Sequence, residues 1–169
     1  MPVVEKFLGR RVEIPEDRRY FAKEGLWAKP EGPDVLFGLT EPFLVLAGGF
    51  SEAEWLFEDG RTVGRGTAVM FAITGKILYI ETPRAGTVFF NDEAKRHPQH
   101  VVADPYGRGW LFKVVSPDGD QGAPKSLDAF QYLEYLRDSE GFKNPEGLKG
   151  GVSGICKAVY SGIREQKIS

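Results

Sequence analysis

The sequence predicts a mainly β fold of short strands, with a few short helices at its periphery. The chain has 169 residues, about the size of one ordinary domain with appendages. It contains 21 glycines and 11 prolines, so turns must be frequent. Between residues 54 and 88 a turn signal recurs about every eight to twelve residues. This spacing is typical of a small sandwich or barrel.

The first elements follow from an apolar run and from the residues that can cap a helix. Residues 35–39 suit a buried strand because the run is short and is bounded by turn residues. Thr40 can then cap a short helix over residues 41–46, with a proline in its first turn and a stop at Gly48.

A tight hairpin is predicted near the centre of the chain. Residues 68–73 and 77–82 read as strands, and the sequence Thr-Gly-Lys separates them. Gly75 is expected to supply a positive φ at the turn. Lys76 then lies at or beside the hairpin tip.

The C-terminal third is expected to hold one more strand and two helices. Residues 110–114 form the strand, in which the ring of Trp110 should be buried. Ser126 is expected to cap a helix with an apolar stripe of Leu127, Phe130, Leu133 and Leu136. Residues 143–169 begin as a Gly-rich linker and end in a short helix, with Ile155, Val159 and Ile163 on one face.

Composition and charge exclude several classes of function. The formal net charge is -2 and no run of basic residues occurs, which argues against nucleic acid as a partner. No stretch approaches the roughly 20 apolar residues that span a bilayer, and the N-terminus lacks the apolar core of a signal peptide. We therefore expect a cytoplasmic protein with no membrane partner.

No catalytic residue can be assigned from the sequence. No nucleophile elbow or phosphate loop is present, so we expect a protein that is not an enzyme. The two histidines, His97 and His100, lack a third nearby ligand, so no metal is expected. Cys156 is the single cysteine, and it serves either as a small apolar filler or as a thiol brought near a dithiolane.

Five segments, in order, carry a resemblance to a known family. Residues 20–27 read Tyr-Phe-Ala-Lys-Glu-Gly-Leu-Trp, residues 37–41 read Phe-Gly-Leu-Thr-Glu, and residues 60–66 have three spaced glycines. Residues 83–92 combine Pro-Arg-Ala-Gly-Thr-Val with a following Asn-Asp. Residues 104–113, Asp-Pro-Tyr-Gly-Arg-Gly-Trp-Leu-Phe-Lys, are the most specific. Over about residues 20–136 the chain resembles the H proteins of the glycine cleavage system.

The resemblance implies both a fold and a cofactor. The fold is the barrel-sandwich hybrid of lipoyl domains, here over residues 20–137, with an N-terminal extension (1–19) and a C-terminal extension (138–169). The cofactor is covalent lipoate on a hairpin lysine, loaded by a lipoate-attaching enzyme. The lipoyl arm shuttles intermediates between partner enzymes, either the glycine cleavage P, T and L proteins or their counterparts in sulfur oxidation.

The match is imperfect at the attachment turn. Counting forward from Gly66 places the attachment lysine of the family on Lys76, whereas counting backward from Pro83 places it on Gly75. The family has an acidic residue three positions before the lysine, where this chain has Ile73. The histidine of the first motif is replaced by Gly25.

Three functions follow from these similarities and departures. The leading one is a lipoyl carrier of glycine cleavage, or of a sulfur-oxidising heterodisulfide-reductase-like system. The second is a paralogue without lipoate that acts as a binding or regulatory module. A biotin carrier is disfavoured because it needs Met on both sides of the lysine, where this chain has Gly75 and Ile77.

Overall fold

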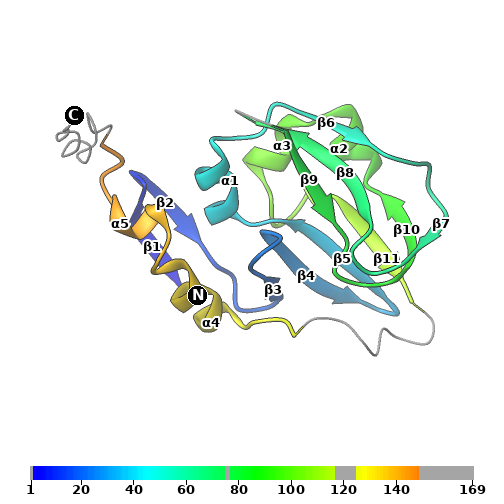
Figure 1. Cartoon of the computed structure of the whole chain (residues 1–169), viewed down its shortest axis with the longest axis horizontal. Coiled ribbons are helices and arrows are strands. Elements are labelled where there is room, and N and C mark those ends of the chain that lie inside the picture. Colours follow the sequence, from blue (N-terminus) through cyan, green and yellow to red (C-terminus); the bar gives the residue numbers. More distant parts are fainter. Residues whose placement is uncertain (1, 75–76, 117–124, 149–169) are drawn as a thin grey trace.

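The computed structural model describes residues 2–74, 77–116 and 125–148 (Figure 1). Its largest element is an antiparallel six-stranded sheet with the strand order β3-β4-β5-β11-β10-β7. The strands, in that order, are Arg19–Phe21, Leu26–Glu31, Asp34–Leu39, Phe112–Val115, Gly86–Phe90 and Arg61–Val63.

A three-stranded antiparallel sheet, ordered β6-β8-β9, packs against one face of the larger sheet. Its strands are β6 (Glu52–Trp55), β8 (Ala68–Ile73) and β9 (Ile77–Glu81). The predicted hairpin is therefore confirmed, with β9 ending one residue earlier than expected. The expected positive φ of Gly75 falls outside the described residues.

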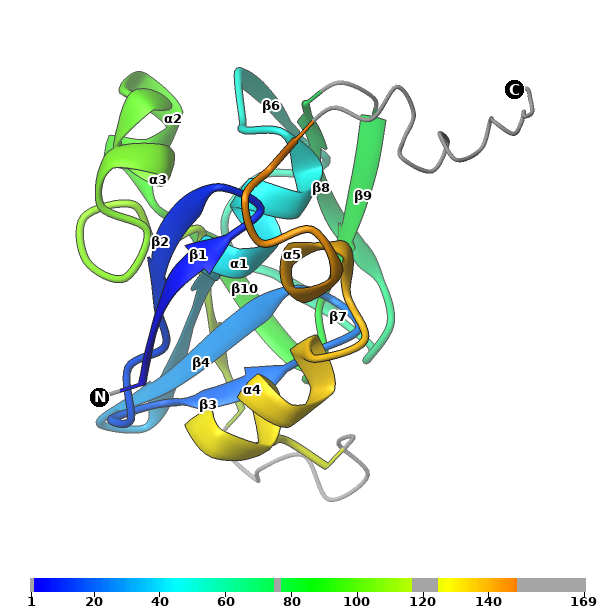
Figure 2. The same ribbon diagram turned by 90° about the vertical axis from the view of Figure 1, so that its left-hand side faces the viewer.

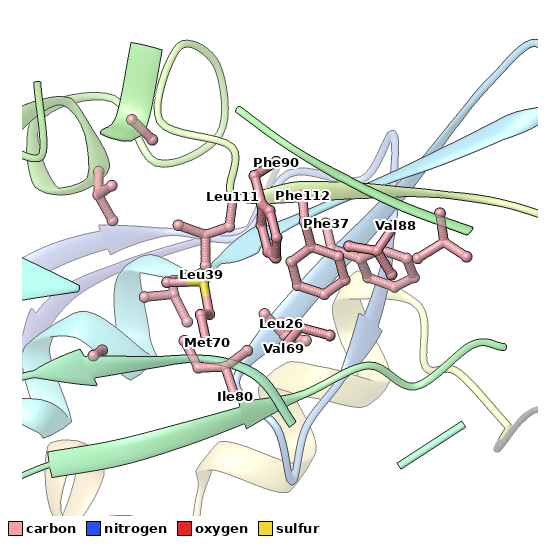
Figure 3. Packing of buried hydrophobic residues seen from close by; sticks show 14 of the residues in the cluster. Leu26, Phe37, Leu39, Val69, Met70, Ile80, Val88, Phe90, Leu111 and Phe112 are labelled. Atoms are coloured by element: carbon pink, nitrogen blue, oxygen red, sulfur yellow. The ribbon is translucent and has the colours of Figure 1, made fainter. Parts of the chain in front are cut away.

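The main core fills the space between these two sheets. Side chains from β4, β5, β10 and β11 meet side chains from β8 and β9 there (Figure 3). The residues labelled there are Leu26, Phe37, Leu39, Val69, Met70, Ile80, Val88, Phe90, Leu111 and Phe112. Phe37 and Phe112 stack with ring centroids 5.1 Å apart, which joins β5 to β11 across the sheet.

Three short helices sit at the edges of this core. Helix α1 (Glu41–Ala47) begins where predicted, because the Thr40 hydroxyl accepts a hydrogen bond from Phe43 N at 3.1 Å. It ends at Gly48, whose φ of 81° is in the left-handed region. Helices α2 (Asp92–Arg96) and α3 (Gln99–Ala103) connect β10 to β11.

A second layer covers the opposite face of the six-stranded sheet (Figure 2). It consists of the hairpin β1–β2 (Val3–Phe7 and Arg10–Glu13) with helices α4 (Ala129–Leu136) and α5 (Glu140–Lys143). Because neighbouring strand residues point to opposite faces, the sheet supplies side chains to both cores. This second core contains Phe7, Val12, Ile14, Tyr20, Trp27, Ala129, Tyr132 and Leu136.

Helix α4 begins two residues later than the sequence predicts. Leu127, two residues before the helix, forms a β-bridge with Tyr20, with both N···O distances 2.8 Å, and this bridge keeps the backbone extended. Asp128 therefore caps the helix, in a capping box with Gln131. The predicted cap, Ser126, instead accepts a hydrogen bond from the Arg19 side chain.

The buried face of α4 differs in part from the predicted apolar stripe. Phe130, predicted to belong to the apolar stripe, is 58% exposed, whereas Ala129, Tyr132 and Leu136 are buried. The phenol of Tyr132 stacks on Tyr20 at 4.8 Å and shares a 2.7 Å hydrogen bond with Thr40. The helix expected near residues 155–163, and Cys156 with it, lie outside the described residues.

The buried tryptophan is Trp27, and the expectation that the Trp110 ring is buried in a strand was wrong. Trp27 is 1% exposed, and its Nε1 donates to the carbonyl of Pro105 at 3.0 Å. Trp110 is half-buried, because a compact turn over residues 104–110 delays the start of β11 to Phe112.

We predict that Trp27→Ala lowers the free energy of unfolding by about 3–5 kcal/mol, because it leaves a large cavity in the second core. Urea denaturation would measure the loss. Trp110→Ala is the matched control and should cost clearly less. Equal losses for the two variants would contradict this assignment of the buried ring.

Asp17 should make the fold sensitive to acid. A hydrogen bond from the Arg18 guanidinium lowers the pKa of Asp17 to about 2, from 3.8. A depressed folded-state pKa stabilises the fold above about pH 4, and this contribution disappears as the pH falls toward 2. Because Asp17 is 55% exposed, the contribution should be about 1 kcal/mol or less. Comparing urea midpoints of wild type and Asp17→Asn at pH 7 and pH 2.5 would test this, since the difference should be clearly smaller at the lower pH.

Candidate functional site

The end of the β8–β9 hairpin is the candidate functional site. Ile73 of β8 and Ile77 of β9 are the last paired residues at this end. Lys76 and Gly75, the two candidate attachment positions, fall between them in the sequence and lie outside the described residues. In both views the end of β8 lies at the top, opposite α4 at the bottom (Figures 1 and 2).

Backbone hydrogen bonds hold the hairpin at both ends. Near the tip, the Ile73 carbonyl accepts from both the N–H and the hydroxyl of Ser51, each at 2.9 Å. At the base, the Thr82 carbonyl accepts a hydrogen bond from Gly66 N at 2.8 Å. The Thr82 N–H donates to the Thr67 carbonyl at 3.0 Å. A hairpin fixed in this way is a rigid support for a group carried at its end.

The three-stranded sheet β6-β8-β9, here called the hairpin sheet, has one buried face and one face with exposed apolar side chains. Met70, Ala72 and Ile80 point inward and are buried in the main core. On the outer face Ile77 is 57% exposed and Tyr79 is 65% exposed. Sequence reasoning predicted the hairpin but missed this outer apolar surface, although the unbroken apolar run in residues 77–80 was its signal.

The segment that most resembles the H proteins, residues 104–113, makes contacts that stabilise the fold. The Tyr106 hydroxyl donates to the Glu13 carbonyl at 2.6 Å and accepts from Glu41 N at 3.0 Å, so it joins the N-terminal hairpin to α1. Gly109 is required because a Cβ there would lie 2.3 Å from the carbonyl oxygen of His100. These contacts lie in the second core and between α3 and β11, and none reaches the hairpin end.

Asn91 anchors the same segment from the end of β10. Its side-chain amide donates to the carbonyls of Arg108 at 2.9 Å and Trp110 at 2.7 Å. Its oxygen accepts from Glu93 N at 3.0 Å and so caps α2. The sequence pattern identified Asn91 as a motif residue without revealing this role.

The two histidines lie at α2 and α3, away from the hairpin end. His100 Nδ1 is 2.8 Å from a carboxylate oxygen of Glu93, which also accepts from Arg108. The hydrogen bond from Arg108 and its charge lower the pKa of Glu93. His97 is exposed. Within residues 2–74, 77–116 and 125–148, no group of three or more His, Cys, Asp or Glu side chains could hold a metal ion.

No helix in the described part of the chain is long and apolar enough to cross a membrane.

Comparison with known proteins gives a consistent result. No family model matches the chain. The glycine cleavage system H protein of Thermus thermophilus is 38% identical over 128 residues, which cover 74% of this chain and 97% of that protein. The H protein of Pseudoalteromonas atlantica is 32% identical over 134 residues, covering 78% and 94%.

A solved structure shows the same relationship. The crystal structure of a glycine cleavage system H protein from Mycobacterium marinum matches with a TM-score of 0.62 and 26% identity, covering 72% of this chain and 98% of that one. The fold is thus a barrel-sandwich hybrid of the lipoyl-domain type, as the sequence predicted. The chain belongs to the glycine cleavage system H protein family, whose members are lipoyl carriers.

We predict that Asn91→Ala destabilises the fold by about 2–4 kcal/mol, because it leaves two carbonyls in a largely buried setting without a donor. Urea denaturation checks this value. Asn144→Ala is the matched control, since the Asn144 side chain makes exposed hydrogen bonds to the backbone of Leu148 near the surface. It should cost less than about 1 kcal/mol. A similar loss in both variants would show that the buried Asn91 contacts stabilise the fold no more than the exposed contacts of Asn144.

Proposed function

We propose that this chain is a lipoyl carrier whose lipoate is attached to the side-chain amine of Lys76. The observation that carries the proposal is the β8–β9 hairpin, whose last residue pair, Ile73 and Ile77, brackets Lys76 in the sequence. Membership of the H protein family supports the same assignment. Of the two candidate positions, Gly75 has no amine to acylate, so the attachment falls on Lys76.

The attachment step is an acyl transfer. The Lys76 ammonium loses a proton, and the free amine attacks the carbonyl of an activated lipoyl donor, an acyl adenylate by chemical class. The C–N amide bond forms, the C–O bond to the phosphate breaks and AMP leaves. When bound, lipoate supplies a disulfide on a long flexible arm that can accept two electrons and two protons and carry an intermediate.

The rigid hairpin and the flexible arm have separate tasks in this proposal. The Ser51 contacts to Ile73 and the buried side chains of Met70 and Ile80 fix the two strands that lead to the attachment position. The arm alone then moves between partner enzymes. We propose that these partners are the glycine cleavage P, T and L proteins, because the relatives carry the name of that system.

Intact-mass analysis after incubation with lipoate, ATP and a lipoate ligase tests the attachment. We expect wild type to gain the mass of one lipoyl group, and peptide mapping should place it on Lys76. Lys76→Arg should gain nothing, whereas Lys23→Arg, a change in an exposed turn, should gain the full group. A wild-type chain that stays unmodified, while an established H protein is modified in the same reaction, would overturn the proposal.

A further inference from the structure

The outer face of the hairpin sheet combines an apolar centre with acidic edges. Strand register places two rows of side chains on it, Glu52–Ile73–Ile77 and Glu54–Phe71–Tyr79. Glu81 follows Tyr79 on the same side of β9. We call this surface the outer hairpin face and define it by Phe71, Ile73, Ile77, Tyr79, Glu52, Glu54 and Glu81.

The apolar centre is not part of either hydrophobic core. Phe71, Ile73, Ile77 and Tyr79 are absent from both clusters of packed residues. Phe71 and Tyr79 pack edge to face, with ring centroids 5.6 Å apart. The surface is therefore preformed, and its aromatic rings lose little conformational freedom when a partner covers them.

The acidic edges select the kind of partner. Glu52 and Glu54 lie on edge strand β6, and Glu81 lies on edge strand β9. No ion pair holds any of these three carboxylates within the described residues. A second copy of this face would bring like charges together, whereas a partner with an apolar contact ringed by Lys or Arg would be complementary.

The position of the outer hairpin face further restricts which kinds of partner can bind there. Any enzyme that acylates Lys76 must bring its reacting carbonyl to that side chain, so its surface must reach Ile73 and Ile77, the last paired residues beside Lys76. Such an enzyme also binds the anionic phosphate of the acyl adenylate, for which basic side chains are suited. Glu52, directly opposite Ile73, places a carboxylate beside this end.

We propose that the outer hairpin face is the docking surface for the enzyme that attaches lipoate to Lys76. This inference rests on the proposed carrier function and adds the residues that recruit the attaching enzyme. Exposed Ile77 and Tyr79, with the partly exposed Phe71 and Ile73, supply the apolar contact. The carboxylates of Glu52 and Glu54 orient it.

The test is the rate at which the full chain is lipoylated by a lipoate ligase with ATP and lipoate, followed by intact mass. Tyr79→Thr and Ile77→Thr keep strand-forming residues and should fold like wild type. We expect each to lower kcat/KM on the order of tenfold, mainly through KM. Glu52→Lys should have a similar effect, and added salt should slow wild type.

Matched controls change similar residues elsewhere. Tyr135→Ala removes an exposed tyrosine from α4, and Glu31→Lys reverses a charge at the end of β4. Both should be lipoylated within about twofold of the wild-type rate. Urea midpoints of all variants verify that each is folded.

The outcomes separate this proposal from the proposed function. If wild type is lipoylated on Lys76 and the face variants react at the wild-type rate, the carrier function stands and the docking surface is overturned. If wild type stays unmodified beside a modified H protein, both are overturned. Binding of the ligase to Lys76→Arg, weakened by Tyr79→Thr and not by Tyr135→Ala, would establish that the effect is on docking.

Discussion

The packing of Trp27 against Gly38 is the contact on which the rest of the fold depends. A Cβ at Gly38 would lie 2.5 Å from the indole, so only glycine lets the ring lie flat on the neighbouring strand. The indole then donates to the Pro105 carbonyl, and the Arg18 guanidinium lies over the ring, 4.6 Å from its centroid. One side chain of β4 thereby connects the sheet, the N-terminal segment and the turn before β11.

This arrangement gives the two faces of the six-stranded sheet different tasks. The face with Trp27 is closed by the N-terminal hairpin and the C-terminal helices, and Gly141 fits against the Phe7 ring where these two parts meet. The other face is covered by the hairpin sheet, which carries the candidate site. The segments that resemble the family supply both faces, because Tyr20 and Trp27 belong to the second core whereas Phe37, Val88 and Phe112 belong to the main core. The chain departs from the family at the attachment turn, between β8 and β9.

The sequence predicted those elements whose signals are local. The cap at Thr40, the stop at Gly48 and the β8–β9 hairpin depend on residues within a few positions of one another, and all three are confirmed. The start of α4 was missed because it depends on the bridge between Leu127 and Tyr20, which are far apart in the chain.

The difference between local signals and contacts across the chain also explains what the sequence revealed of the candidate site. It identified Lys76 as the candidate nucleophile, because a lysine beside a turn is a local feature. It did not reveal that Phe71 and Tyr79 lie side by side, because that contact requires the register between two strands. Nor did it identify Trp27 as the buried indole, since its partner Pro105 lies 78 residues away.

The alternation of side chains along β8 and β9 has an evolutionary consequence. Inward residues such as Met70 and Ile80 are constrained by core packing, whereas outward residues such as Ile77 and Tyr79 are exposed and are not. The outward positions can therefore drift at little cost to folding. A duplicated gene could acquire a new partner by changing these positions alone, while every residue of the interior is inherited intact.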